Sequence, residues 1–201
     1  MWLVRLAAKM FGKLKWWQQA LLVCLTPLLL LNLAVAFFGQ SVVNPLSPFF
    51  LEEKATALGK YFRHRPFCLL HGHPDVVEIA RAAEKRSKLP AGLMQAIVSV
   101  ESENAPHRIS YAGAMGPAQL MPDTAQELGV KDPFDPEESI DAGARYLKKM
   151  LERTGKVELA VAAYNAGPGN VHGRVPDIGQ TRVYVERVMK RFASKKTGGS
   201  S

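Results

Sequence analysis

The sequence has few cysteines, no stretch with the alternating pattern of a β-strand and no internal repeat. Among its 201 residues, only Cys24 and Cys68 are cysteines. Cys24 lies inside a long apolar run, so a disulfide between the two is not expected. No cluster of His, Cys and Asp suggests a metal site, and we expect neither a metal nor a cofactor. Without strands or repeats, the chain is predicted to be all-α or nearly so.

Charge is also missing from one long stretch, residues 20–38. A helix of this length rises about 28 Å, close to the thickness of the hydrocarbon core of a bilayer. Four basic residues precede it without any acidic residue among them: Arg5, Lys9, Lys13 and Lys15. Residues 20–38 are therefore predicted to form a single transmembrane signal anchor, with residues 1–19 as a basic cytoplasmic N-terminus and the rest of the chain in the periplasm.

A cleaved signal peptide is the alternative interpretation of the same run, because Ala34-Val35-Ala36 resembles a cleavage site. The long basic segment before the run and the length of the run itself favour an uncleaved anchor in the inner membrane. The net charge of the whole chain is +8, but the predicted compartment argues against nucleic acid as a partner.

Beyond the anchor, the sequence predicts three further segments. Residues 39–73 form a linker and accessory segment, with a helix at 50–62 and a loop at 63–73. Residues 74–193 form a mostly helical domain, and residues 194–201 form a flexible basic tail. Capping residues, prolines and apolar spacing predict five helices in this domain: 74–87, 90–102, 136–153, 156–166 and 182–193.

One acidic residue stands where an apolar helix is about to end. Leu93, Ile97 and Val100 mark the buried face of the helix from Pro90, and Glu101 falls four residues after Ile97 on that face. Loss of solvation and the negative end of the helix dipole are both expected to raise the pKa of Glu101. A carboxyl that keeps its proton near neutral pH suits a general acid that protonates a glycosidic oxygen.

The same helix geometry distinguishes Glu101 from the nearby Glu103. Glu103 points away from the buried face and is predicted to be solvated. A purely structural role for Glu101, paired with an arginine or capping a neighbouring backbone, is the alternative to a general acid.

Several short motifs around this acid occur together in one order. They are Glu101-Ser102, Ser110, AGAMG at 112–116, QLMP at 119–122, Thr124-Ala125, GARYL at 143–147, AYNAGPG at 163–169 and Tyr184-Val185. As an ordered set, from about Pro74 to Val188, they resemble the catalytic domain of the soluble-lytic-transglycosylase family. That resemblance implies a lysozyme-like fold and cleavage of bacterial peptidoglycan.

The resemblance also implies roles for individual residues. Glu101 matches the catalytic acid and base, and five residues match substrate-binding positions: Ser110, Gln119, Met121, Tyr164 and Asn165. Three of these have a structural alternative: Ser110 as the cap of a turn, Met121 as a core residue and Tyr164 as a packed ring whose hydroxyl bonds a carbonyl.

The chain departs from the family pattern at one place in the cleft. The family usually has Gly-Leu-Met-Gln where this chain has Gly116-Pro117-Ala118-Gln119. Pro117 fixes φ and lacks an N–H group, and Ala118 replaces a long side chain. We expect this to reshape the sugar subsites without touching the acid.

The expected mechanism follows from a missing second carboxylate. Ordinary glycosidases place a second carboxylate about 5–10 Å from the acid, and residues 104–121 contain none. The family instead relies on the substrate's own N-acetyl group, and a 1,6-anhydromuramyl product results. A lysozyme-type hydrolase is the first alternative, if an acid such as Asp123 or Asp135 reaches the cleft.

A second alternative is a non-catalytic glycan-binding scaffold of an envelope-spanning machine. The expected partners are the glycan strands of peptidoglycan, the inner membrane and a secretion or conjugation apparatus.

Overall fold

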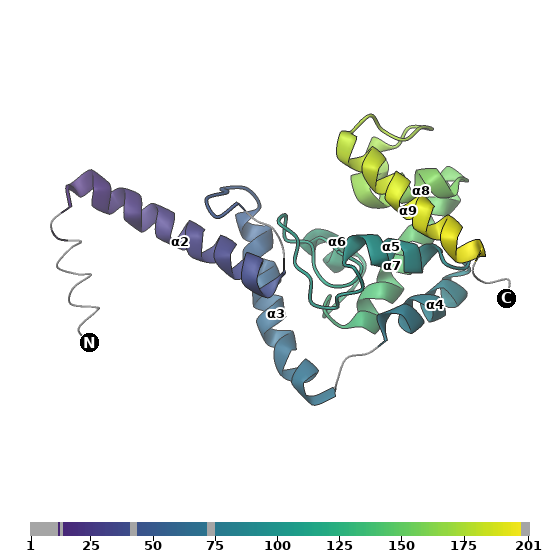
Figure 1. Cartoon of the computed structure of the whole chain (residues 1–201), viewed down its shortest axis with the longest axis horizontal. Coiled ribbons are helices and arrows are strands. Elements are labelled where there is room, and N and C mark those ends of the chain that lie inside the picture. Colours follow the sequence, from purple (N-terminus) through teal and green to yellow (C-terminus); the bar gives the residue numbers. More distant parts are fainter. Residues whose placement is uncertain (1–11, 13, 41–43, 72–74, 198–201) are drawn as a thin grey trace.

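The computed structural model describes residues 12, 14–40, 44–71 and 75–197 of the chain. An extended arm leads into a compact helical domain (Figure 1). The arm consists of α2 (Trp16–Phe38) and α3 (Leu51–His71). The domain contains α4 (Val76–Ser87), α5 (Leu93–Glu101), α6 (Pro122–Glu127), α7 (Pro136–Thr154), α8 (Val157–Ala166), the 3₁₀ turn η1 (Pro168–Asn170) and α9 (Gly179–Thr197).

The all-helical prediction is confirmed. Within the described ranges the only β pairing is a pair of isolated bridges, which join Met115 to Ile109 and to Leu120. The capping residues act as their types predict. Asp135 accepts a hydrogen bond from the backbone N–H of Glu138 at 2.9 Å at the start of α7, and Gly155 ends that helix with φ of 69°.

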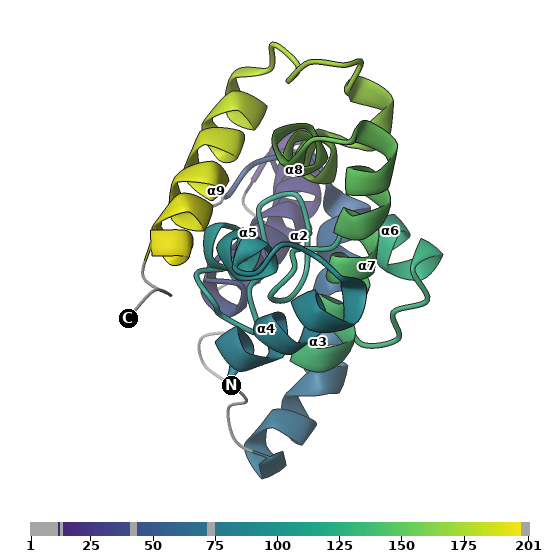
Figure 2. The ribbon, with the colours of Figure 1, turned by 90° about the vertical axis from the view of Figure 1, so that its right-hand side faces the viewer.

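The core of the domain surrounds α5. This helix packs against α4 on one side and α9 on the other, while α7 packs against both α4 and α8. Seven of its nine residues are buried, and it lies between α9 and α4 near the middle of the domain (Figure 2). A helix that is apolar on nearly every side is stable only in such a place, because no face of it prefers water. The end of α5 is therefore held firmly by its surroundings.

Several helix bounds differ from the sequence prediction. The helix α3 continues to His71, whereas residues 63–73 were expected to form a loop; residues 72–74, including Pro74, lie outside the described residues. Similarly, α9 extends to Thr197 and so takes in the first part of the expected flexible tail. Arg191 donates to the carbonyl of Ser99 and Lys195 donates to Gln95. These contacts tie two of the basic residues of α9 to α5.

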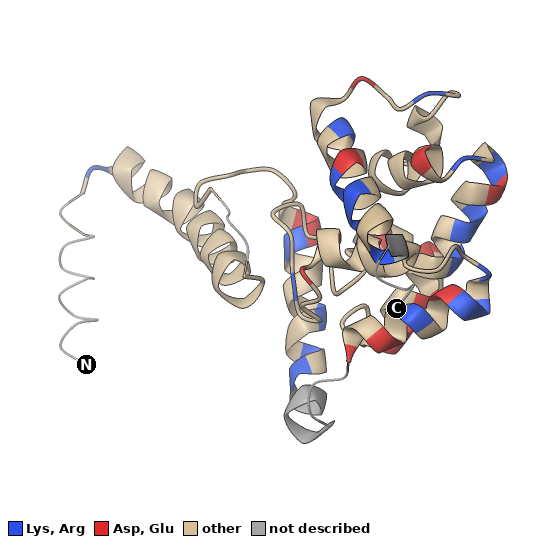
Figure 3. Ribbon diagram, turned by 45° about the vertical axis from the view of Figure 1, so that its right-hand side comes forward, with Lys and Arg blue, Asp and Glu red and all other residues tan. Residues whose placement is uncertain are grey.

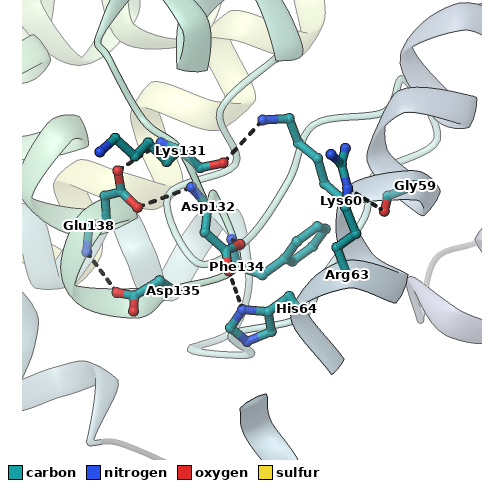
Figure 4. Close-up of polar contacts among 9 residues, drawn as sticks. All are labelled: Gly59, Lys60, Arg63, His64, Lys131, Asp132, Phe134, Asp135 and Glu138. Atoms are coloured by element: carbon teal, nitrogen blue, oxygen red, sulfur yellow. Dashed lines mark hydrogen bonds and ion pairs between the residues drawn. The ribbon is translucent and has the colours of Figure 1, made fainter. Parts of the chain in front are cut away.

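The accessory helix α3 is fixed to the domain by polar contacts (Figure 4). The Nδ1 atom of His64 lies 2.5 Å from a carboxylate oxygen of Asp132, and the Lys60 ammonium donates to the carbonyl of Lys131 at 3.3 Å. Glu138 holds the same turn by accepting from the backbone N–H groups of Lys131 and Asp132. Helix α3 of the arm is thus docked on the surface of the domain, which the expectation of a linker did not foresee.

The first helix of the arm carries no charge along its length (Figure 3). Helix α2 has 23 residues and is the one helix among the described residues that is long and apolar enough to cross a membrane. It begins four residues before the predicted span, at Trp16, which is exposed together with Trp17. Gly39, which caps the end of α2, contacts the domain, since its carbonyl accepts from the N–H of Ile109 at 3.2 Å.

Candidate active site

Glu101 is the last residue of α5 and is only partly exposed. Its pKa is raised from 4.5 to about 7, chiefly because burial penalises the charged form. Two neighbours act in the opposite direction: the hydroxyl of Tyr184 donates to Glu101 Oε1 at 2.7 Å, and the positive charge of Arg187 also favours the ionised form. The expected rise in the pKa is confirmed, and it leaves the carboxyl able to give and take a proton near pH 7.

Glu101 opens into a cleft of about 580 Å³, within the size range of ligand-binding sites. All five residues predicted to bind substrate line this cleft together with Glu101: Ser110, Gln119, Met121, Tyr164 and Asn165. They come from the loop after α5, from the start of α6 and from the end of α8. Segments more than sixty residues apart in sequence therefore meet at one acid.

The loop from 110 to 121 is held by its own side chains. Ser110 Oγ accepts from the backbone N–H groups of Ala112 and Ala114, at 3.2 and 2.9 Å. Ser110 thus caps a turn and lines the cleft as well. Gln119 has a left-handed backbone with φ of 48°, and its amide donates to the carbonyls of Arg108 and Gly116. Such a conformation persists only where the surroundings impose it, and it occurs often at functional sites.

The two cleft residues from α8 are also tied to the scaffold. The hydroxyl of Tyr164 donates to the carbonyl of Ala118 at 2.9 Å, which is the structural alternative raised for it. Burial and the negative charge of Glu101 raise the pKa of Tyr164 well above 10. Asn165 accepts from the hydroxyl of Thr181 at 3.0 Å. Met121 is partly exposed in the cleft rather than enclosed in the core.

Two tyrosines of the site, Tyr184 and Tyr146, were not predicted from the sequence to have a site role. Tyr184 lies on α9 and is nearly buried, and its hydroxyl is the one bonded to Glu101 across 83 residues of sequence. Tyr146 on α7 lines the cleft and packs edge-on against the ring of Tyr164. Both residues belong to the motifs that carry the family resemblance, and that was the only signal available for them.

Other acidic residues of the described ranges do not line the cleft, although burial and, after it, the negative charge of Glu127 raise the pKa of the cleft residue Tyr146. Of the described residues that line the cleft, Glu101 alone is an Asp or a Glu. Asp123 lines a separate cavity between α3 and α6, and Asp135 caps α7. Glu103 is exposed, as expected, and forms an ion pair with Arg108 at 3.4 Å. The geometry therefore provides one acid and no second carboxylate on the walls of the cleft.

The effect of the hydrogen bond from Tyr184 on the pKa of Glu101 can be tested by substitution. Because this hydrogen bond favours the ionised form of Glu101, Tyr184→Phe is expected to raise the pKa of Glu101 above its value of about 7. NMR titration of the carboxyl carbon, in protein labelled at glutamate, measures it. Tyr164→Phe is the matched control, since that hydroxyl bonds a carbonyl and not the acid, and it is expected to move the pKa much less. An unchanged or lowered pKa in Tyr184→Phe contradicts the prediction.

The fold and the site define a helical domain with a single proton-exchanging acid at the floor of a cleft. The model of one protein family, described as "Transglycosylase SLT domain", matches residues 78–177. This part of the chain belongs to the transglycosylase SLT domain family.

Part of the chain is also similar to curated proteins. A protein named "Transglycosylase" from Enterobacteria phage PRD1 is 37% identical over 115 residues, which is 57% of this chain and 42% of the relative. "Membrane-bound lytic murein transglycosylase F" of Aeromonas salmonicida is 42% identical over 86 residues, covering 39% of this chain and 17% of that protein. The chain thus spans less than half the length of these relatives.

A solved structure shares the fold. It is an inactive mutant of the lytic transglycosylase Slt from Pseudomonas aeruginosa, 24% identical to this chain with a TM-score of 0.52. The match covers 74% of this chain and 31% of that one. At this level of identity the likeness establishes the fold alone, and it confirms the lysozyme-like architecture expected from the sequence.

Proposed function

We propose that this protein is a peptidoglycan lytic transglycosylase that cleaves the β-1,4 bond between N-acetylmuramic acid and N-acetylglucosamine. One observation carries the proposal: a single partly buried acid with a pKa of about 7 lies in the cleft, with no second carboxylate among the described residues that line it. The family of residues 78–177 and the printed names of the relatives support the same activity.

In the first step Glu101 acts as a general acid. Its proton passes to the glycosidic oxygen as the bond from that oxygen to C1 of the muramyl residue breaks, and the N-acetylglucosamine hydroxyl leaves. The positive charge that develops at C1 needs stabilisation, which a carboxylate supplies in ordinary glycosidases. Here we assign that task to the N-acetyl group of the muramyl residue, whose carbonyl oxygen reaches its own C1.

In the second step the same residue acts as a base. Glu101, now ionised, takes the proton of the muramyl 6-hydroxyl while that oxygen attacks C1. The product is a 1,6-anhydromuramyl end, and the proton returns to Glu101, so no water is consumed. Tyr184 supports this exchange, because its hydroxyl stabilises the carboxylate in the interval when it is ionised.

The product distinguishes this mechanism from hydrolysis. Digestion of purified sacculi by the protein is expected to give muropeptides that are lighter than lysozyme products by one water, with almost no new reducing ends. Mass spectrometry and a reducing-sugar assay measure the two properties. Products dominated by reducing muramic ends, with oxygen-18 taken up from labelled water, would instead identify a lysozyme-type hydrolase. Binding of sacculi without any cleavage would favour the scaffold.

We also propose that α2 anchors the domain to the inner membrane, with the catalytic cleft in the periplasm. The charge-free helix, its basic N-terminal side and the membrane-bound relatives support this. Such a location suits local opening of the wall for a secretion or conjugation apparatus, which cross-linking in intact cells would identify.

The anchor can be tested by topology. Protease added to spheroplasts is expected to remove a tag placed at the C-terminus, while mass spectrometry finds the N-terminus uncleaved. A mature protein that begins near Phe37 would show that the apolar run is a cleaved signal peptide and not an anchor.

A further inference from the structure

The charge-free stretch of the sequence continues beyond the end of α2. Residues 16–51 contain no Asp, Glu, Lys, Arg or His, with Lys15 before them and Glu52 after them. The structure describes most of the segment that joins α2 to α3, and we call residues 44–51 the apolar loop. Four large apolar side chains of this loop are exposed: Leu46 (53%), Phe49 (69%), Phe50 (40%) and Leu51 (39%). Large apolar side chains exposed so close together in the chain are typical of a surface that another apolar phase covers.

The apolar loop folds back along α2 instead of extending away from it (Figure 1). The side-chain amide of Asn32, a buried residue of α2, donates to the carbonyls of Pro45 and Ser47 at 3.2 and 3.0 Å. The side-chain oxygen Oδ1 of Asn32 accepts from the ammonium group of Lys54 at 2.7 Å, and Lys54 is fully buried. These bonds hold the loop beside Asn32, six residues before the end of the helix.

This position places the loop near the outer surface of a bilayer that α2 spans. From Trp16 to Asn32 the helix rises about 24 Å, whereas a hydrocarbon core is about 30 Å thick. Beyond Asn32 one side of the helix contacts the rest of the protein, because Val35 is buried and Gly39 bonds Ile109. The free part of α2 is thus somewhat short for a bilayer, and the apolar loop adds apolar surface at the level where the helix meets the domain.

The charges after the loop set its depth. Glu52 is exposed at the start of α3, and an ionised side chain there is costly to bring into hydrocarbon. The loop therefore suits the boundary between head groups and acyl chains, where Phe and Leu side chains enter and charges remain in water.

We propose that the apolar loop is a second membrane contact, which inserts into the outer interface of the phospholipid bilayer beside α2. The inference rests on the proposed anchor. Its consequence is a domain held in one orientation, because the loop is joined directly to the cleft: the ring of Phe50 packs edge-on against Tyr111, a cleft residue, with centroids 5.9 Å apart. Helix α3 continues from the loop and is fixed to the domain by the contacts of Figure 4.

The test uses the full chain in nanodiscs of phosphatidylethanolamine and phosphatidylglycerol. Cys24 and Cys68 are replaced by serine, and a nitroxide label is placed at Leu46→Cys or Phe49→Cys. Collision of the label with oxygen, which concentrates in acyl chains, is compared with collision with a water-soluble nickel chelate. Val183→Cys is the matched control, because this apolar residue is exposed to a similar extent, 56%, and belongs to α9, a helix on the side of the domain away from α2 (Figure 1).

Oxygen is expected to dominate at positions 46 and 49, and nickel at position 183. Nickel dominating at all three positions, in a chain that remains in the nanodisc, overturns the second contact and leaves the anchor intact. Protection of positions 46 and 49 from both reagents overturns it as well and identifies a protein partner or a second copy on the loop. A chain that does not enter nanodiscs overturns the anchor itself, and no outcome depends on catalytic activity.

Discussion

Glu101→Gln is expected to lower turnover on sacculi by about 10²-fold or more, with the fold unchanged. Glutamine keeps the shape of the side chain and still accepts from the hydroxyl of Tyr184, but it has no proton to deliver to a glycosidic oxygen. Release of soluble muropeptides per folded molecule measures the effect. Glu103→Gln is the matched control, because Glu103 is exposed and pairs with Arg108 at the surface, and it is expected to retain nearly full turnover.

The stability of the same variant tests the cause. The folded protein holds the proton of Glu101 up to about pH 7, whereas the unfolded chain releases it near pH 4.5. The free energy of unfolding of the wild type therefore falls as the pH rises from about 4.5 to about 7, by up to about 3 kcal/mol at about 1.4 kcal/mol per pH unit. Glutamine does not ionise, so the free energy of unfolding of Glu101→Gln is free of this decrease. The variant should therefore become more stable relative to wild type as the pH rises from about 4.5 to about 7. Urea unfolding at pH 4.5 and pH 8 measures it.

A buried structural role for Glu101 predicts the opposite results. If Glu101→Gln unfolds more easily than wild type at both pH values, and activity per folded molecule is unchanged, the carboxyl is part of the scaffold and not a general acid. A gain in stability together with the loss of turnover is the pattern expected of a site whose burial is costly to the fold but necessary for the chemistry.

Gly116→Ala is expected to destabilise the domain by roughly 3 kcal/mol or more, or to prevent folding. Gly116 has φ of 71°, and a Cβ atom there would lie 1.8 Å from the carbonyl oxygen of Pro133. The positive φ and the clash with a backbone atom act together, and no side-chain rotation relieves either of them. Thermal unfolding followed by circular dichroism measures the effect.

Gly129→Ala separates the two contributions. Gly129 has a similar φ of 73°, but no atom lies within 4 Å of the position of its Cβ. Only the strain of the left-handed backbone then disfavours alanine, and the free energy of unfolding is expected to fall by about 1–2 kcal/mol. Equal losses in the two variants would show that the close approach of Pro133 is not important for stability.

The sequence predicted well those features that depend on neighbours along the chain. The charge-free run of 20–38 corresponds to α2, and the caps Asp135 and Gly155 bound α7 as expected. The raised pKa of Glu101 also followed from local spacing, since a residue four positions after Ile97 shares its buried face. The ordered motifs indicated the family and the residues that line the cleft. They did not reveal the contacts of each hydroxyl.

Two features escaped prediction because they depend on distant segments. The sequence of residues 63–71 contains Pro66 and several polar residues, which are typical of a loop, yet α3 includes them and docks on the domain through His64 and Asp132. The apolar loop resembled a linker, since nothing local shows that Asn32 holds Pro45 and Ser47 against α2.

The sequence by itself determined the helical class, the apolar helix, the family of residues 78–177 and the acid at the end of α5, because each of these depends on spacing and composition within a short stretch. Only the tertiary structure decided which hydroxyl bonds that acid, which carboxylates stay away from it and where the apolar loop lies. Tyr184 is 83 residues from Glu101, while Asp123 lines a cavity between α3 and α6 and Asp135 caps α7. Contacts of this kind arise only when separate helices pack, since packing brings together side chains that no local pattern relates.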